Sequence, residues 1–316
     1  MAKVYFSKEL TADSLVRIYE ALGVQLPGKI GVKVSTGEAG GNNYLKPELI
    51  GDLVKKLNAN IIECNTAYPG KRNTVEDHLK VAEDHGFTKI ADVDIMDPDN
   101  AEFEIPVEIK NAYGTESAGK HMDVDIVGEH LNNYDSMLNL AHFKGHAMGG
   151  FGGVLKNQSI GVASRNGKAY IHSAGKDRNP ITAWDNLPAQ NDFLESMAEA
   201  AKAVSDYFGK KASSDEPGYG INGANGRILY IDVMNNLSVD CDCDSSPEDP
   251  CMADIGILAS TDPVALDQAA IDLIWNSSDK GRDHFVERVE RQNGRHILPY
   301  AEGIGLGRRE YELIEI

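Results

Sequence analysis

The first 93 residues alternate between two kinds of apolar pattern, and this alternation limits the folds that the chain can adopt. Short runs rich in β-branched residues indicate strands at 3–6, 29–34, 61–64 and 89–93. Apolar residues at helical spacing separate these runs and indicate helices at 10–22, 47–57 and 74–85. Repeated strand–helix–strand units predict an α/β fold, with a mostly parallel sheet and helices on both of its faces.

The rest of the chain resumes this pattern after an interruption. Residues 100–135 are acidic and irregular, which predicts a small subdomain. Beyond them, apolar spacing predicts two further helices and two further strands. The helices are expected at 193–208 and 263–275, and the strands at 227–234 and 254–259. Thr261 or Asp262 is the expected cap of the second helix.

The order of these elements predicts where a ligand binds. We expect two lobes, 1–135 and 136–316, with a cleft between them; one continuous domain is the alternative. Ligands of parallel sheets bind at the carboxyl ends of the strands. The polar loops that follow Val34 and Cys64 are therefore expected at this cleft.

The charge of the chain disfavours several classes of partner. The 316 residues carry 49 acidic and 31 basic side chains, a net charge of −18, which argues against nucleic acid and anionic membranes. The N-terminus lacks a signal-peptide pattern, and no apolar run reaches the ~18 residues of a membrane span. We expect a cytoplasmic protein that binds a small anionic molecule through a cationic patch inside the cleft.

Three of the four cysteines, Cys241, Cys243 and Cys251, lie close together in an acidic segment. Neighbouring carboxylates raise the pKa of a thiol, whereas a bound cation stabilises thiolates and carboxylates together. The segment therefore favours a metal ion or an iron–sulfur cluster such as a 4Fe–4S centre. Cys64, which ends a separate expected strand, is either a further ligand or a small buried residue. An acidic surface loop with incidental cysteines is the alternative to a metal site.

The spacing of the cysteines excludes several familiar motifs. A C-x-C pair is neither the C-x-x-C of a zinc ribbon nor the run of a ferredoxin. An EF-hand that began at Asp240 would place Ser245 where glycine is needed and Cys251 where glutamate is needed. The chain also lacks G-x-S-x-G and H-E-x-x-H, which disfavours typical serine hydrolases and zincins.

A second dense segment joins histidines, glycines and a lysine. His142 and His146 are four residues apart, which on a helix places both rings on one face, as metal ligands or as an acid/base pair. Glycines follow, including Gly152 and Gly153, and allow the backbone to approach a ligand closely. Lys156 is the expected catalytic cation. A tight structural turn with surface histidines is the alternative.

Other residues complete the expected binding site or stand apart from it. The residues expected to bind the substrate are Gly152, Gly153, Asn157, Lys71 and Arg72. His172 lies at the end of an expected strand and is interpreted as a lone structural histidine; the alternative is that it joins His142 and His146.

Several phrases of the sequence together are similar to those of one protein family. They are residues 32–38, 63–68, 142–146, 152–157, 240–243 and 254–265. On these phrases the chain resembles the domain-of-unknown-function 362 family, whose members are often described as iron–sulfur or ferredoxin-like proteins. The resemblance implies an α/β core and, in many members, a ferredoxin module, which this sequence lacks. Any cluster would therefore depend on the core's own cysteines.

A looser likeness concerns the nickel-dependent lactate racemases. Their histidines precede a glycine–lysine segment, an order that His142, His146, Gly153 and Lys156 repeat here.

Three functions remain open from the sequence. The first is a metal- or iron–sulfur-dependent oxidoreductase that acts on a small anionic substrate and exchanges electrons with a redox partner protein. The second is a metal-dependent isomerase or racemase in which paired histidines transfer protons. The third is a non-catalytic metal-binding module. An enzyme is favoured if the cysteines and the 142–156 segment share one cleft.

Overall fold

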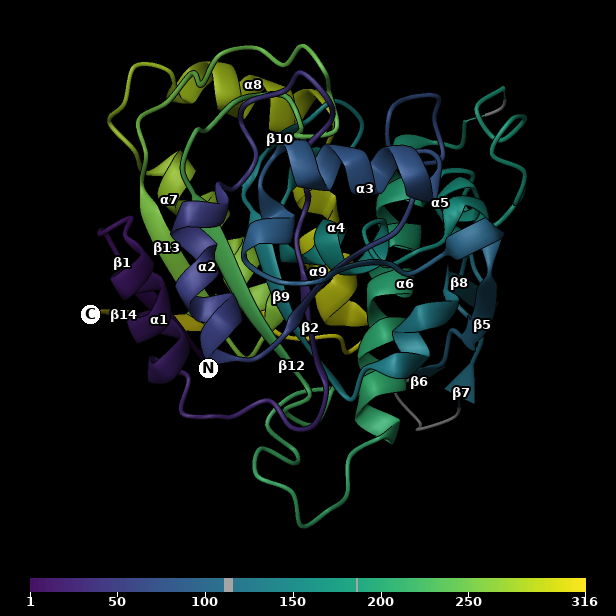
Figure 1. Cartoon of the computed structure of the whole chain (residues 1–316), viewed down its shortest axis with the longest axis horizontal. Helices are drawn as coiled ribbons and strands as arrows, with labels where there is room; N and C mark the ends of the chain where they lie inside the picture. Colours follow the sequence, from purple (N-terminus) through teal and green to yellow (C-terminus); the bar gives the residue numbers. More distant parts are fainter. Residues whose placement is uncertain (111–115, 186) are drawn as a thin grey trace.

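One eight-stranded sheet runs through the chain in the computed structural model, which describes residues 1–110, 116–185 and 187–316. In spatial order the strands are β14 (Tyr311–Glu315), β1 (Ala2–Ser7), β13 (Gly256–Ser260), β12 (Ile228–Met234), β9 (Ser136–His142), β2 (Ile30–Lys33), β3 (Asn60–Glu63) and β4 (Val93–Ile95). Five of the seven neighbouring pairs are parallel, whereas β13 is antiparallel to both β1 and β12. The predicted α/β fold with a mostly parallel sheet is confirmed (Figure 1).

Strands from both halves of the sequence are neighbours in this sheet. β9 pairs with β2 on one side, with Ile30 opposite Ser136, and with β12 on the other side. The two predicted lobes, 1–135 and 136–316, therefore share one sheet. Their division into separate lobes stays a prediction.

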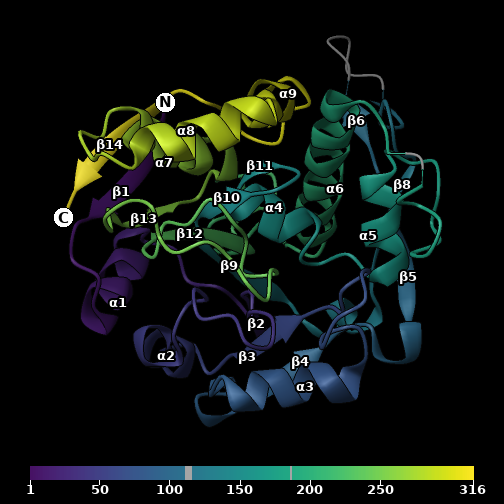
Figure 2. The ribbon, with the colours of Figure 1, turned by 90° about the horizontal axis from the view of Figure 1, so that it is seen from above.

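Helices cover both faces of the sheet, as predicted (Figure 2). One face packs against α1 (Ala12–Ala21), α2 (Pro47–Lys56) and α3 (Val75–Asp84). The other face packs against α4 (Val154–Ser159), α6 (Gln190–Lys210), α7 (Pro263–Trp275) and α9 (Ile297–Gly303). α5 (Arg165–His172) and α8 (Arg282–Arg291) lie beside this second group. Within the described ranges, no helix is both long enough and apolar enough to cross a membrane.

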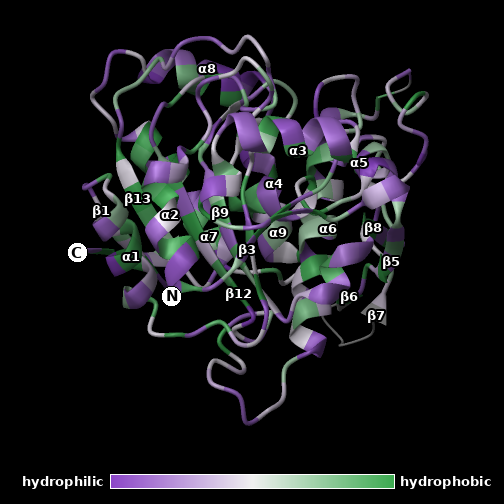
Figure 3. Ribbon diagram, in the orientation of Figure 1, coloured by the Kyte–Doolittle hydropathy of each residue, from purple (hydrophilic) through white to green (hydrophobic). Residues whose placement is uncertain are grey.

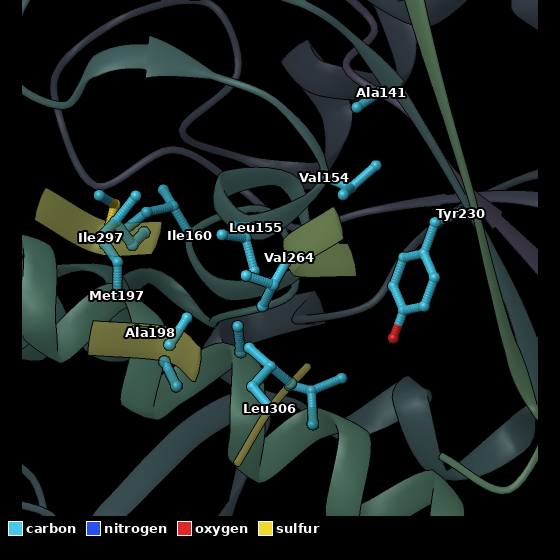
Figure 4. Close-up of a cluster of buried hydrophobic side chains, with 14 of the residues drawn as sticks. Ala141, Val154, Leu155, Ile160, Met197, Ala198, Tyr230, Val264, Ile297 and Leu306 are labelled. Carbon is cyan, nitrogen blue, oxygen red and sulfur yellow. The ribbon is translucent and has the colours of Figure 1, made fainter. Parts of the chain in front are cut away.

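Two apolar cores follow from this layering, and hydrophobic residues concentrate on the central strands and on the helix faces that meet them (Figure 3). Leu15 and Ile18 of α1 are fully buried against one face. On the other face, Leu155 of α4 and Val264 of α7 pack in a cluster with Met197 of α6 (Figure 4). Burial of these aliphatic side chains fixes α4, which carries Lys156, against the sheet.

The ends of several helices follow the sequence closely. Asp262, one of the two expected caps, accepts the backbone N–H groups of Val264 and Ala265 at 2.9 and 3.0 Å. Thr74 caps α3 in the same way, and Pro47 occupies the first turn of α2. These caps confirm the expected beginnings of the three helices.

The strand expected at 89–93 is wrong. A 3-10 turn, Phe87–Lys89, occupies its first part, and β4 begins only at Val93. Ile90 packs against Gly51 of α2 instead of pairing in the sheet. The apolar residues of this run pack against a helix outside the sheet, and their spacing in the sequence could not indicate this contact.

The acidic segment 100–135 contains short strand pairs outside the main sheet. β5 (Glu102–Pro106) pairs with β8 (Val124–Gly128), and β6 (Ile109–Lys110) pairs with β7 (Glu116–Ser117). The small subdomain expected there stays a prediction.

Asp125 of β8 should make the stability of the fold depend on pH. Its carboxyl group is fully buried, has no hydrogen-bond partner among the described residues, and has a pKa that burial raises to about 8. In the unfolded chain this pKa is about 3.9, so between these values only the unfolded state releases the proton. Stability should therefore fall as pH rises through this range, by at most about 1.4 kcal/mol per pH unit.

Asp125→Asn should remove this loss. Chemical denaturation at pH 5 and pH 8 should show the variant gaining stability relative to the wild type as pH rises. Asp52→Asn, an exposed position on α2, serves as the control. Equal pH slopes for Asp125→Asn and the wild type would contradict the assignment.

Candidate functional site

A cavity of about 470 Å³ opens where the central parallel strands end. Lys33 ends β2, Cys64 follows β3 and His142 ends β9, and all three line this cavity. The loop after β12 adds Cys241 and Cys243 to the same wall. The site therefore lies at the carboxyl ends of the strands, as expected for a parallel sheet.

Most of the residues singled out from the sequence meet here. Those that line the cavity are Cys64, Arg72, His142, His146, Gly152, Gly153, Lys156, Asn157, Cys241 and Cys243. Lys71 lines a second, outer cavity of about 430 Å³, which shares His146, Cys241 and Cys243 with the first. Cys251 lines neither. The two thiols thus lie on a wall between an inner and an outer space.

The helical placement of His142 and His146 is wrong. His142 ends β9, and His146 ends β10 (Lys144–His146), which forms a hairpin with β11 (Gly150–Gly152). Alternate residues of an extended chain share a face, so both histidines still face the cavity together with Lys144.

Gly145 allows the cysteine loop to approach this hairpin. Its N–H donates to the Ser238 carbonyl at 2.8 Å, and a Cβ at position 145 would lie 2.3 Å from the Val239 carbonyl oxygen. Only glycine fits such an approach without displacing the backbone. The contact brings the 238–243 loop beside His146.

His142 has a supporting role in this geometry. Its Nδ1 lies 2.8 Å from an oxygen of Asp242, and its Nε2 lies 2.6 Å from the Asn235 carbonyl oxygen. Lys144 donates to the other oxygen of Asp242 at 2.7 Å. Because both nitrogens of His142 face acceptors, the ring is engaged on both sides and orders the cysteine loop through Asp242.

Cys241, Cys243 and His146 form the group best placed to hold a metal ion among the described residues. Their ligand atoms all lie within 4.8 Å of one another. Two sulfurs suit a soft or borderline transition metal rather than magnesium or calcium. The Nδ1 of His146 already accepts the N–H groups of Met148 and Gly149 at 3.2 and 2.8 Å. His146 could therefore bind a metal only through Nε2, after losing a proton there, so the fit is best for the two thiols.

The expectation that carboxylates raise the thiol pKa does not hold for Cys241. A hydrogen bond from Cys243 lowers the pKa of Cys241 well below its usual range, and Lys156 and Lys144 lower it further despite burial. Lys156 Nζ lies 3.6 Å from the sulfur. The flanking carboxylates have their own cations: Asp240 pairs with Arg288 at 2.8 Å, and Asp242 pairs with Lys144. Cys241 is therefore a thiolate to which Cys243 donates.

The other two cysteines do not join this group. Cys64 is buried in the cavity wall, where its thiol donates to the Val162 carbonyl at 3.1 Å, and burial raises its pKa. Cys251 donates to the Leu237 carbonyl at 3.3 Å, outside both cavities. The structure thus places two of the four predicted metal ligands together, with Cys64 in the same cavity and Cys251 apart.

His172 has hydrogen bonds complementary to those of His146. It ends α5 rather than a strand, and its Nδ1 donates to the Lys168 carbonyl at 2.7 Å. Among the described residues no hydrogen-bond partner lies at its Nε2, which leaves a free lone pair. The ring lines the cavity and stacks on Phe193 with a centroid distance of 4.9 Å. Burial, and to a smaller extent His146 and Lys156, lower its pKa to about 3, so the ring is neutral.

The two neutral rings therefore present opposite chemistry. His146 accepts at Nδ1, so its proton sits on Nε2; His172 donates at Nδ1, so its free lone pair sits on Nε2. Burial is also the main cause that lowers the pKa of His146.

The cavity is cationic although the chain is acidic. The positively charged residues that line it are Lys33, Lys144, Lys156, Lys168 and Arg72. Glu63 is the one carboxylate among its described lining residues. Glu63 and Glu38 already pair with Arg72 at 3.3 and 3.4 Å. The excess charge is therefore on the lysines, which suits a small anion.

The family of the chain can be assigned by comparison. The family model for DUF362, a domain of unknown function, matches residues 30–272. The chain belongs to this family. No functionally curated protein matches the sequence.

Two solved structures show a likeness to this DUF362 chain. The lactate racemase apoprotein from Thermoanaerobacterium thermosaccharolyticum is 13% identical with a TM-score of 0.36, over 74% of this chain and 50% of that one. A structural-genomics protein from Thermotoga maritima is 10% identical with a TM-score of 0.40, over 89% of this chain and 56% of that one. The chain thus spans about half the length of these structures.

Several residues of this DUF362 site were not predicted from the sequence. Lys144 could have been found, because 142, 144 and 146 alternate along an extended segment. Lys33 and Lys168 carry no local signal, since only the tertiary fold brings them to one cavity from β2 and α5. His172 was placed on a strand, which hid the cavity-facing end of α5.

Lys33 should make anion binding depend on pH. Burial lowers its pKa to about 8, and Lys168 and Lys156 repel its charge, against an opposing effect of Glu63. Its ammonium is therefore present below pH 8 and is lost as pH rises through this value. Sulfate keeps a constant charge over this range, so its dissociation constant should rise about three- to tenfold between pH 7 and pH 9.

Calorimetric titration of the wild type and of Lys33→Met would check this expectation. The variant should bind sulfate more weakly at pH 7 and lose most of the pH dependence. Lys55→Met, an exposed position on α2, should behave as the wild type. An unchanged pH dependence in Lys33→Met would assign the effect to another group.

Proposed function

We propose that this DUF362 protein is a metal-dependent isomerase or racemase that moves a proton on a small anionic molecule. The observation that carries the proposal is the pair His146 and His172. Both rings line one cavity, both are neutral, and their hydrogen bonds set opposite tautomers. A base and an acid in one cavity are what proton transfer at a carbon atom requires.

The lysines support an anionic substrate. Lys33, Lys156 and Lys168 lie close enough for their charges to influence one another. A carboxylate placed among them would gain three attractions and would orient the neighbouring carbon between the histidines. His172 Nε2 would accept the proton from that carbon, and His146 Nε2 would supply one.

The thiols would hold the metal. Cys241 and Cys243 offer two sulfurs at the same cavity wall, and Lys156 lies beside Cys241. A bound metal ion would supply Lewis-acid polarisation of a substrate oxygen. Asp242 fixes the cysteine loop through His142 and Lys144, so the thiols keep their position relative to the lysines.

The other two predicted functions have weaker support. The cysteine loop and the 142–156 segment share one cavity, an arrangement that favours an enzyme over a metal-binding module. An oxidoreductase needs an electron acceptor, and no feature of the described residues favours electron transfer over proton transfer. The pair predicted for a racemase, His142 and His146, is replaced here by His146 and His172, because His142 has both nitrogens engaged.

Solvent exchange tests the proposal. Full-length protein, purified without oxygen, is incubated in D₂O with a panel of small 2-hydroxy and 2-oxo acids. Proton NMR follows the hydrogen on the carbon next to the carboxylate of each hydroxy acid and the hydrogens on the carbon next to the ketone of each oxo acid. We expect exchange of these hydrogens for at least one acid, together with loss of optical purity for a chiral one. No exchange for any acid with metal-loaded protein would overturn the proposal.

A further inference from the structure

A second group of candidate ligands lies on α6, outside both cavities. His121, from the segment between β7 and β8, lies with its Nε2 2.7 Å from an oxygen of Glu195 and 3.9 Å from an oxygen of Asp192. The three ligand atoms lie within 4.8 Å of one another. Asp192 and Glu195 are three residues apart on the helix and therefore share a face.

The segment that carries His121 is fixed to the helix. Glu199, one turn beyond Glu195, accepts the backbone N–H groups of Lys120, His121 and Met122 at 2.7 to 3.4 Å. Tyr300 of α9 donates to the same carboxylate at 2.6 Å. These backbone hydrogen bonds to Glu199 therefore hold the His121 imidazole over α6, in addition to its own contact with Glu195. In Figure 2, α6 lies between α9 and the β5–β8 pair.

Glu195 is held as an acceptor from both sides. His296 lies 2.8 Å from its other oxygen, opposite His121. His296 therefore orients this carboxylate as an outer-sphere hydrogen-bond partner orients a metal ligand.

An exposed cation already occupies the open side of this group. Lys120 donates to the oxygen of Glu195 that faces His121, at 2.6 Å, and its side chain is 59% exposed. Asp192 is also partly exposed, at 35%. Three carboxylates, those of Asp192, Glu195 and Glu199, lie around the single ammonium of Lys120. The local charge is negative, and the cation that partly balances it can swing into solvent.

We propose that His121, Asp192 and Glu195 bind a divalent transition-metal ion of the zinc class, which displaces Lys120. One imidazole and two carboxylates are a donor set that zinc accepts. The ion would tie the segment before β8 to α6. Phe193 of α6 stacks on His172, so the site would also stabilise one wall of the cavity. The inference is independent of the proposed function, because none of its ligands lines the cavity.

Zinc titration of the Cys241→Ser/Cys243→Ser chain tests the site without the thiols. Calorimetry should show one zinc ion bound and a rise in thermal stability. His121→Ala or Asp192→Asn on this background should weaken binding at least tenfold, whereas His284→Ala, which removes an exposed histidine paired with Glu248, should not. Lys120→Ala should tighten binding several-fold, because the competing cation is gone. A salt-bridge network without a metal site predicts no such tightening.

A second measurement covers the case in which the cysteine variants do not fold. In the wild type, zinc should protect His121 from acylation by diethyl pyrocarbonate, as mapped by mass spectrometry, while His284 stays reactive. Unchanged acylation of His121 under saturating zinc would overturn the inference. Zinc binding that survives His121→Ala, or that Lys120→Ala leaves unchanged, would overturn it as well.

Discussion

Replacing Cys241 by serine should abolish thiolate-to-metal absorption when the protein is titrated with Co²⁺. Cys241 and Cys243 supply the two sulfurs of the group, and a serine hydroxyl is a far poorer ligand for a soft or borderline ion. Loss of one of two sulfurs should lower metal affinity by at least about a hundredfold, a value at the upper end of what a lost outer-shell partner costs. The charge-transfer absorption reports only metal that is bound to sulfur. The site on α6, which has no sulfur ligand, therefore does not interfere.

Cys251→Ser is the matched control. Cys251 lies in the same acidic segment but outside both cavities, so its replacement should leave the cobalt spectrum unchanged. Cys243→Ser should behave as Cys241→Ser. A spectrum that needs Cys251 as much as Cys241 would contradict the two-thiol site and would require the loop to rearrange.

The fold was largely predictable because local periodicity and tertiary packing agree in most of the chain. The apolar patterns at 29–34 and 47–57 each predict a single element, a strand and a helix, and the structure has these elements there. The strand predicted at 89–93 was wrong because Ile90 packs against α2 instead of pairing in the sheet. Periodicity predicts that a residue is buried, but it does not predict which element the residue packs against.

The residue types of the site were more predictable from the sequence than the ion pairs and hydrogen bonds that these residues make. The loops after parallel strands were expected to meet, and Cys241, His146 and Lys156 do meet there. The charge state of Cys241 was not predictable, because Asp240 and Asp242 are neutralised by cations far away in the sequence. The same holds for the histidines. The sequence favoured His142 over His172 as a functional residue, and only the hydrogen bonds show that His142 is engaged at both nitrogens and that His172 has a free one.

Replacing His172 by glutamine should lower proton exchange by a factor of about 10² to 10⁴, the usual contribution of a positioned acid or base. Glutamine keeps much of the volume and can still donate to the Lys168 carbonyl, but it offers no basic nitrogen to the cavity. His146→Gln should cause a loss of the same order, since it removes the complementary acid. The rate of deuterium incorporation into the best substrate of the acid panel measures both effects.

The control and the contrary outcome use two other histidines. His284 is exposed and paired with Glu248, so His284→Gln should exchange as the wild type does. His142→Gln should act differently from His172→Gln, because His142 supports the cysteine loop through Asp242 and has no free nitrogen. Its main effect should be on metal affinity, with exchange restored by added metal. The contrary outcome is that His142→Gln abolishes exchange in metal-saturated protein while His172→Gln retains it. Proton transfer would then belong to His142 and His146. The assignment of His172 as the base would be wrong.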